Sequence, residues 1–306
     1  MKLKDLLDKE HLLAPLLLLP VVIYVVLLIG FPFIMAFVYS LSNVTVGNPD
    51  FKIIGIKNFI DLIGDRVFQK SLFNTVVFTF VSIGLVVTLS HILAEILARE
   101  FKAKWLVRFL ILLPWTAPIA LGAVGYLWFL DSVFSPIDWL LRRAGLLGTP
   151  NAILGSMSNL YWLGRPGLAM ASVIMVHVWR LIPLGTMILI AGMNSIPKEI
   201  LEAAQVDGAG YFRRLFHITL PLLFPVIGVT ILFAVFFTFT DMAVVWVITK
   251  GGPPDHSTQV LASLAFLKGI QGGDLAQGAA IALFFFPVLA GIAAIVLRLV
   301  KKAVVI

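Results

Sequence analysis

The sequence predicts an all-helical membrane protein with six transmembrane helices. Of its 306 residues, 60% are hydrophobic and only 13% are charged. The mean hydropathy is +1.03, which means more apolar surface than one water-soluble core could bury. The apolar residues also fall into continuous windows long enough to cross a hydrocarbon core of about 30 Å as helices. A transmembrane barrel would instead show segments of roughly 10 residues with alternating polarity.

Six such windows follow one another, and we expect each to form one span. They lie at about 12–41, 72–97, 105–130, 168–194, 220–248 and 276–300, within a single transmembrane domain that covers residues 1–306. The first window is too long for a cleavable signal peptide and lacks a small-residue cleavage site, so we expect it to remain as a span. Three prolines interrupt it, namely Pro15, Pro20 and Pro32. Later windows contain Pro114, Pro118, Pro183 and Pro287, which we interpret as static kinks, the alternative being bends used in alternating access.

The distribution of lysine and arginine predicts which segments face the cytoplasm. The N-terminus, the loop at 98–104 with Arg108, the segment 195–219 and the C-terminus together carry a higher density of bases than the other three loops. The positive-inside rule therefore places both termini and the segment 195–219 in the cytoplasm. The bases on this side are Lys2, Lys4, Lys9, Arg99, Lys102, Lys104, Arg108, Lys198, Arg213, Arg214, Arg298, Lys301 and Lys302.

Charge and composition argue against other classes of function. The net charge is +7, but the bases are spread over every loop without a basic run, so membrane topology explains them better than nucleic-acid binding. A chain without cysteine forms no disulfide and no thiolate metal site. His91 and Glu95 are spaced for a helix-surface pair, and a metal site would need more ligands.

The sequence contains no Gly-Lys dipeptide and so no phosphate-binding loop, which means that nucleotide chemistry must come from another polypeptide.

The segment 195–219 is polar although it lies between two very apolar windows. Ser195 is a candidate cap for a short helix with a proline in its first turn. Gly208 and Gly210 then let the chain turn before Tyr211 begins a second short helix. The expected structure is a compact helix–turn–helix at the membrane face, while the plain alternative is an ordinary loop.

The residues of this segment resemble the EAA loop of permease subunits of ATP-binding-cassette (ABC) importers. The resemblance rests on Glu202-Ala203-Ala204, Asp207-Gly208-Ala209, Phe216, Ile218, Leu220-Pro221 and Pro225. Further motifs extend it over nearly the whole chain: Gly55-Ile56-Lys57-Asn58-Phe59, Asn74-Thr75, Leu113-Pro114, Trp179, Pro183, Ala191-Gly192, Ile196-Pro197 and Thr249-Lys250-Gly251-Gly252-Pro253. The last motif is similar to one found in the carbohydrate-uptake branch, and the chain looks most like the first permease of maltose or glycerol-phosphate transporters.

This resemblance implies a type I ABC importer permease fold with cytoplasmic EAA coupling helices in a bacterial or archaeal cytoplasmic membrane. It implies a second permease subunit, two ATP-binding subunits and an extracytoplasmic solute-binding protein as partners, besides membrane lipid. ATP and Mg²⁺ would be bound by the ATPase partners, so no cofactor, metal or catalytic residue is expected in this chain. The residues expected to couple to the ATPase are Glu202, Ala203, Ala204, Asp207, Gly208 and Ala209.

Charged residues inside spans are costly and indicate functional positions. Arg180 and Asp241 lie deepest, and we expect Arg180 on one helical face with His177, Leu181 and Leu184. On the fifth span, Phe237, Thr238, Asp241 and Val245 are expected to share a face. In the family, the corresponding helices line the translocation cavity, so Thr238, Asp241, Phe237, Arg180 and His177 are candidates to contact a sugar. The alternative is that Arg180 and Asp241 pair with each other, or with the second permease, to fix helix packing.

The leading hypothesis is the permease of an ATP-driven importer for a di- or oligosaccharide. Glycerol-3-phosphate or a related polyol is the alternative substrate. A carrier that works alone on an ion gradient is disfavoured, because few acidic residues lie inside the spans. A membrane-embedded enzyme would need His, Asp or Ser clustered at one depth in facing spans, and no such cluster is evident.

Overall fold

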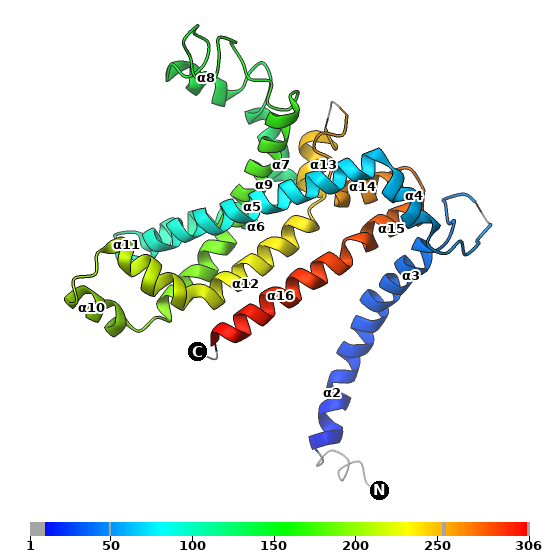
Figure 1. Ribbon diagram of the computed structural model, residues 1–306, viewed down its shortest axis with the longest axis horizontal. Coiled ribbons are helices and arrows are strands. Elements are labelled where there is room, and N and C mark those ends of the chain that lie inside the picture. The colour runs from blue at the N-terminus through cyan, green and yellow to red at the C-terminus, as the bar shows by residue number, and fades with distance from the viewer. Residues whose placement is uncertain (1–9, 49, 253–254, 305–306) are drawn as a thin grey trace.

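The computed structural model describes residues 10–48, 50–252 and 255–304. This part of the protein is a bundle of helices with no β-strand (Figure 1). Ser42 and Ile53 form an isolated antiparallel bridge in the loop after the first helix. The prediction of an all-helical fold is confirmed.

Long apolar helices alternate with short helices in the connections. The apolar segments are α2 (Glu10–Val25), η1 (Val26–Gly30) and α3 (Phe31–Ser40); α5 (Arg66–Ala98); α6 (Lys104–Thr116) and α7 (Ile119–Phe129); α9 (Pro166–Asn194); α11 (Tyr211–Arg214), η2 (Leu215–Thr219) and α12 (Leu220–Phe239); and α15 (Leu275–Phe284) and α16 (Phe286–Val304). The connections contain α4 (Lys57–Gly64), α8 (Pro136–Arg143), α10 (Lys198–Val206), α13 (Ala243–Thr249), α14 (Leu261–Phe266) and η3 (Leu267–Gln271), where η marks a π-helical turn. Within the described ranges, five helices are long and apolar enough to span a membrane, or six if the bent pair α6–α7 counts as one span.

The predicted third span is not one straight helix. Its two halves, α6 and α7, meet at an angle of 96°, and Ala117 between them is extended, with φ −67° and ψ 140°. A residue that precedes proline is pushed out of the helical region by the proline ring. Pro118 therefore breaks the segment at Ala117, and our interpretation of this proline as a kink within a span understates the change of direction.

The predicted fifth span, 220–248, is wrong at both ends. The helix stops at Phe239, and the short α13 begins only at Ala243, so Asp241 and Val245 do not share a helical face with Thr238. At the other end, the second short helix expected at Tyr211 runs through η2 into α12, giving one helix of 29 residues. The polar start of this helix is thus continuous with its apolar part and does not form a separate element.

The first and last apolar segments are each one long helix with a local irregularity before a proline. Leu13–Ser40 contains Pro15 and Pro20 within α2, and its π-helical turn η1 ends just before Pro32. Leu275–Lys302 has a turn at Phe285, two residues before Pro287. A proline cannot donate a hydrogen bond to the carbonyl four residues earlier, and its ring crowds that carbonyl. The regular helix is therefore disturbed in the turn just before the proline.

The centre of the bundle is the pair α5 and α9. A Cβ added to Gly185 would lie 2.5 Å from Ser90 Oγ, so only glycine allows the two helices to approach this closely. Ser90 Oγ donates a hydrogen bond to the carbonyl of Ile182 at 3.0 Å. The buried core between α5, α9, α12 and α13 includes Phe78 and Val245, and the polar residues described below are set into it.

The bundle has two distinct ends in Figure 1. The coupling-segment helix α10 and the C-terminal part of α16 lie at one end, and α4, α13 and α14 lie at the other. The first helix diverges from the rest, and its apolar side chains are exposed along most of its length. It contacts the bundle through α3, where Phe33 packs on Phe286 with ring centroids 5.4 Å apart. Lipid or another apolar partner must cover such a surface.

Two sequence motifs secure the loops at the α4 end. The amide of Asn58 donates to the carbonyls of Ser40 and Ser42, at 2.9 and 2.8 Å, and so ties the end of α3 to α4. The amide of Asn74 donates to the carbonyls of His256 and Gln259, at 3.1 and 3.0 Å. The Asn74-Thr75 motif thus holds the loop that follows α13, while Pro253 of the glycine-rich motif lies outside the described residues.

Candidate functional site

Four of the five candidate substrate-contacting residues form one buried polar cluster. His177 and Arg180 come from α9, Thr238 from the last turn of α12, and Asp241 from the break before α13. Asp241 Oδ2 lies 2.6 Å from His177 Nδ1 and accepts a hydrogen bond from Arg180 Nη2 at 3.2 Å. His177 Nε2 lies 2.9 Å from Thr238 Oγ1.

The break in the fifth span exists because Asp241 satisfies the backbone there. Its Oδ1 accepts a hydrogen bond from the N–H of Val244, in the first turn of α13, at 3.0 Å. An aspartate at a helix start supplies the acceptor that the first N–H groups lack. In an apolar interior these groups have no water to turn to, so the carboxylate makes the interruption possible.

The polar atoms of this cluster point toward one another. The side chains of His177, Arg180 and Asp241 are 0%, 9% and 2% exposed, and the His177 ring packs on Phe78 with centroids 4.8 Å apart. Arg180 and Asp241 therefore pair with each other in this conformation, which is the alternative to a direct role in sugar binding. A sugar hydroxyl could reach them only if the helices move apart.

Phe237 is not part of this cluster. Its ring packs edge-on against Trp115 of α6 with centroids 5.1 Å apart, and it stacks on Phe233 at 6.4 Å. With Trp115 and Phe233 it forms an aromatic group between α6 and α12, although it is next to Thr238 in the sequence. The structure thus separates the proposed apolar platform from the polar groups.

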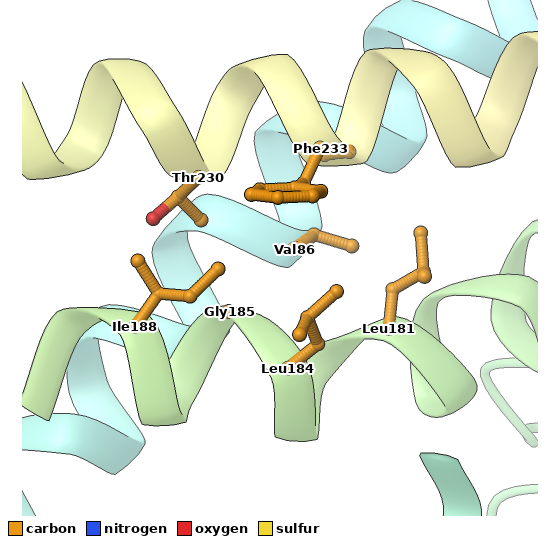
Figure 2. Close-up of a pocket in the computed structure, with 8 residues that line it drawn as sticks. Val86, Leu181, Leu184, Gly185, Ile188, Thr230 and Phe233 are labelled. Atoms are coloured by element: carbon orange, nitrogen blue, oxygen red, sulfur yellow. The ribbon is translucent and has the colours of Figure 1, made fainter. Parts of the chain in front are cut away.

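A small apolar pocket lies beside the cluster, between α5, α9 and α12 (Figure 2). Leu181 and Leu184, which the sequence places on the same face as His177, point into it together with Phe233. Thr230 also lines the pocket, but its hydroxyl donates to the carbonyl of Val226 at 3.0 Å. The pocket therefore presents hydrocarbon, and contributes packing more than recognition.

The segment 195–219 contains α10 and a tight turn, as its glycines predict. Gly208 has φ +72°, a left-handed conformation that glycine adopts without steric cost. The N–H of Ala209 donates to the carbonyl of Ala204 at 2.9 Å, and the N–H of Gly208 to that of Gln205 at 3.0 Å. These two bonds form the Schellman arrangement that ends a helix at a glycine.

This turn leaves most of the EAA residues on the surface. Ala204 is buried against the protein, whereas Glu202, Ala203, Asp207 and Gly208 are exposed. In Figure 1, α10 stands off from the helix bundle at one end of the molecule. Small exposed side chains beside an exposed carboxylate are suited to close contact with another protein.

Sequence reasoning missed three contacts that shape these sites. Phe78 covers His177, Val244 binds Asp241 through its N–H, and the hydroxyl of Tyr211 donates to the carboxylate of Glu95. Only the second has a local signal, because an Asp three residues before a helical position is a cap pattern. His91 Nε2 lies 3.6 Å from Glu95 Oε1, so the pair expected from their spacing is close but is not a hydrogen bond.

Comparison with known proteins places this geometry in a family. Residues 86–304 match the model of the family described as binding-protein-dependent transport system inner membrane component. The sulfoquinovosyl glycerol transport system permease protein SmoG of Agrobacterium fabrum is 30% identical over 295 residues, covering 95% of this chain and 91% of that protein. The trehalose/maltose transport system permease protein MalF of Thermococcus litoralis is 31% identical over 278 residues, covering 91% of this chain and 90% of MalF.

Solved structures agree on the fold. A chain of a bacterial ABC transporter involved in the import of the acidic polysaccharide alginate superposes with a TM-score of 0.77 at 21% identity, covering 98% of both chains. The family match includes α9, α10 and α12, which carry the polar cluster and the EAA turn. This chain is therefore a multi-pass membrane transport subunit with the ABC importer permease fold, and it belongs to the family of inner membrane components of binding-protein-dependent transport systems.

Proposed function

We propose that this chain is one of two permease subunits of an ATP-driven importer that moves a carbohydrate into the cytoplasm. A solute-binding protein outside the membrane would deliver the sugar, and two ATP-binding subunits would supply the energy. The names of similar proteins support a carbohydrate, since they include transporters for sulfoquinovosyl glycerol, trehalose and maltose, and diacetylchitobiose. A similar permease for sn-glycerol-3-phosphate supports the second candidate substrate.

The observation that carries this proposal is the exposed turn at the end of α10. Glu202, Ala203 and Gly208 are all exposed, and the Schellman bonds fix the backbone around them. We infer that α10 docks into a cleft of an ATPase subunit, with the carboxylate of Glu202 facing a basic residue there. The bases concentrated on this side of the membrane, and the positive-inside rule, support a cytoplasmic position for α10 and for both termini.

A single long helix links this docking turn to the buried polar cluster. Tyr211–Phe239 is one helix of 29 residues, about 44 Å long at 1.5 Å per residue. Its first residue follows the turn at Gly208, and its last turn carries Thr238 beside Asp241. When ATP closes the two ATPase subunits, a shift of α10 would move this helix as a lever. Separation of Thr238 and Asp241 from α9 would then free their polar atoms for sugar hydroxyls.

The test compares glycines and glutamates in matched pairs. Gly208→Ala forces a side chain into a left-handed conformation at φ +72°, while Gly210, at φ −64°, accepts alanine without strain. A new Cβ meets no atom within 4 Å at either position, so the backbone alone separates the two variants. Glu202→Ala is likewise compared with Glu199→Ala, which removes a carboxylate from the first turn of the same helix.

Uptake and ATPase activity are measured with the reconstituted complex and labelled sugar. We expect Gly208→Ala and Glu202→Ala to lose coupled uptake and ATPase assembly, while Gly210→Ala and Glu199→Ala keep both. Normal coupled transport in the Gly208 and Glu202 variants would refute the role of the turn. Uptake by this chain alone, without nucleotide, would support a gradient-driven carrier instead. Binding of sugars and of glycerol-3-phosphate to the partner binding protein decides between the two substrate classes.

A further inference from the structure

A pocket of about 490 Å³ lies between α10 and the ends of the spans. Its walls come from the end of α5, the end of α9, α10 and the start of the long helix at Tyr211. Three bases line it, namely Arg99, Lys198 and Arg214, together with one acid, Glu95. We propose that this pocket binds a phosphate-bearing anion, which bridges α10 to the ends of α5 and of the long helix.

The charges of the pocket are unbalanced. The bases Arg99, Lys198 and Arg214 have no ion-pair or hydrogen-bond partner among the described residues. Glu95 offsets only one of these three charges, and its carboxylate accepts the hydrogen bond from the Tyr211 hydroxyl and faces His91 instead of pairing with a base of the pocket. Three bases that converge on one pocket repel one another, and an anion with several oxygens relieves this repulsion through charge-assisted hydrogen bonds.

Helix ends of both signs meet at this pocket. Both α10 and the long helix begin at residues that line it, Lys198 and Tyr211, and among the described residues neither start has a side-chain cap, so the first N–H groups have no side-chain acceptor. The negative end of α9 also lies here, and the N–H groups of Ser195 and Ile196 donate to its last carbonyls, at Gly192 and Met193. The opposite, negative end of α5 is already covered. Lys104 Nζ donates to the carbonyl of Ala98 at 3.3 Å, and Arg108 Nη2 to that of Leu97 at 3.0 Å.

The position of the pocket suits a phosphate at the membrane surface. The spans end around it, at Ala98 and Asn194 on two helices and at Tyr211 on the third. In the topology that we propose for the importer, on which this step rests, that level is the headgroup layer of the cytoplasmic leaflet. Basic pockets between helices at this level bind the phosphates of anionic lipids, and a soluble phosphate compound offers the same chemistry.

Occupancy of the pocket would regulate coupling. Of the α10 residues that the structure describes, Ala204 is buried, whereas the helix as a whole stands off from the bundle. A bound phosphate joins Lys198 on α10 to Arg99 on α5 and Arg214 on the long helix, and so fixes the docking helix to the lever that it drives. Transport would then depend on the phosphate-bearing anions available at this face of the membrane.

The test uses a reporter inside the pocket. The chain has no cysteine, so Gln205→Cys, at a residue that lines the pocket, provides a single site for an environment-sensitive fluorophore. The assembled transporter is placed in phosphatidylcholine nanodiscs with increasing phosphatidylglycerol, or in phosphatidylcholine alone with inorganic phosphate. Potassium chloride at equal ionic strength controls for screening.

We expect a saturable change in emission with at least one of the two anions and none with chloride. The Arg99→Gln/Arg214→Gln variant should bind about tenfold more weakly, because two charge-assisted contacts are lost. Arg213→Gln is the matched control, since Arg213 is adjacent, exposed and not part of the pocket wall. Arg99→Lys/Arg214→Lys should recover much of the affinity, which shows that charge rather than folding is responsible.

A response to phosphatidylglycerol alone identifies a lipid headgroup, and a response to inorganic phosphate identifies a soluble anion. The inference is overturned if neither anion gives a saturable change, or if the Arg99/Arg214 glutamine variant responds as Arg213→Gln does. This outcome is independent of the proposed function. If the transporter imports sugar normally but the reporter gives no response, the anion site is refuted and the proposed transport function stands.

Discussion

Removing the carboxylate of Asp241 is the most informative perturbation of the buried cluster. This carboxylate lies 2.6 Å from His177 Nδ1 and 3.2 Å from Arg180 Nη2, and it accepts the N–H of Val244 at 3.0 Å. Breaking a buried pair by deleting one partner costs about 3–5 kcal/mol, because the other charge is left uncompensated. The stranded N–H of Val244 costs about 1–3 kcal/mol. We therefore expect Asp241→Ala to lower the free energy of unfolding by at least about 3 kcal/mol.

Denaturant titration of the purified chain in detergent, followed by tryptophan fluorescence, measures this loss. The matched control is Asp255→Ala, which also breaks an aspartate ion pair, with Lys70 at 2.7 Å, but at a side chain that is 66% exposed. Exposed pairs contribute little, so this variant should lose far less stability. Combining Asp241→Ala with Arg180→Met should cost less than the sum of the two single changes, because the stranded base is gone. Equal losses for Asp241→Ala and Asp255→Ala, or strict additivity of the double variant, would refute the assignment of a buried charge pair.

Two further predictions concern packing and pH. Gly185→Ala should destabilise the protein by about 1–3 kcal/mol through overpacking, since its Cβ would lie 2.5 Å from Ser90 Oγ. In thermal unfolding, adding Ser90→Ala should restore part of the lost stability. Gly125→Ala should have little effect, because a Cβ there meets no atom within 4 Å. Burial raises the pKa of Asp65, but the hydrogen bonds from Lys268 and from the N–H of Val67 outweigh it and hold the pKa below its ordinary value. Its stabilisation is therefore present above about pH 4 and lost as the pH falls below that. Thermal stability measured from acid to neutral pH should decline less steeply in Asp65→Asn, and an identical acid decline in both proteins would contradict the role of this carboxylate.

The sequence predicts the helical bundle because the relevant signals are local. Continuous apolar windows give the spans, and Gly208 gives the turn after α10 because a glycine there lets the last carbonyls of the helix be satisfied. Ala117 before Pro118 also carries a local signal, but its consequence depends on the fold. A proline in an apolar window is either accommodated within a continuous helix, as Pro183 is in α9, or accompanies a change of direction of 96°.

The break at Asp241 was not predictable in the same way. The run from Phe236 to Val245 contains no glycine or proline, and its apolar character favours a continuous helix. Asp241 caps the N–H of Val244 locally, but its buried carboxylate is in turn held by His177 and Arg180, more than 60 positions away in the chain. At Tyr211 a helix start is predicted correctly, but the helix does not end before Pro221 and continues through η2 into α12. At Asp241 tertiary contacts outweigh local preference.

The central claim is that the turn after α10 contacts an ATPase subunit. Because the chain has no cysteine, Ala203→Cys can carry a single photo-crosslinker on the exposed face of α10, and Phe134→Cys can carry one near α8, at a side chain that is 77% exposed. Cross-linking in native membranes, followed by mass spectrometry, should join the Ala203 probe to the ATPase and the Phe134 probe to other proteins. A probe at Ala203 that never captures the ATPase, or one at Phe134 that does, would contradict the claim.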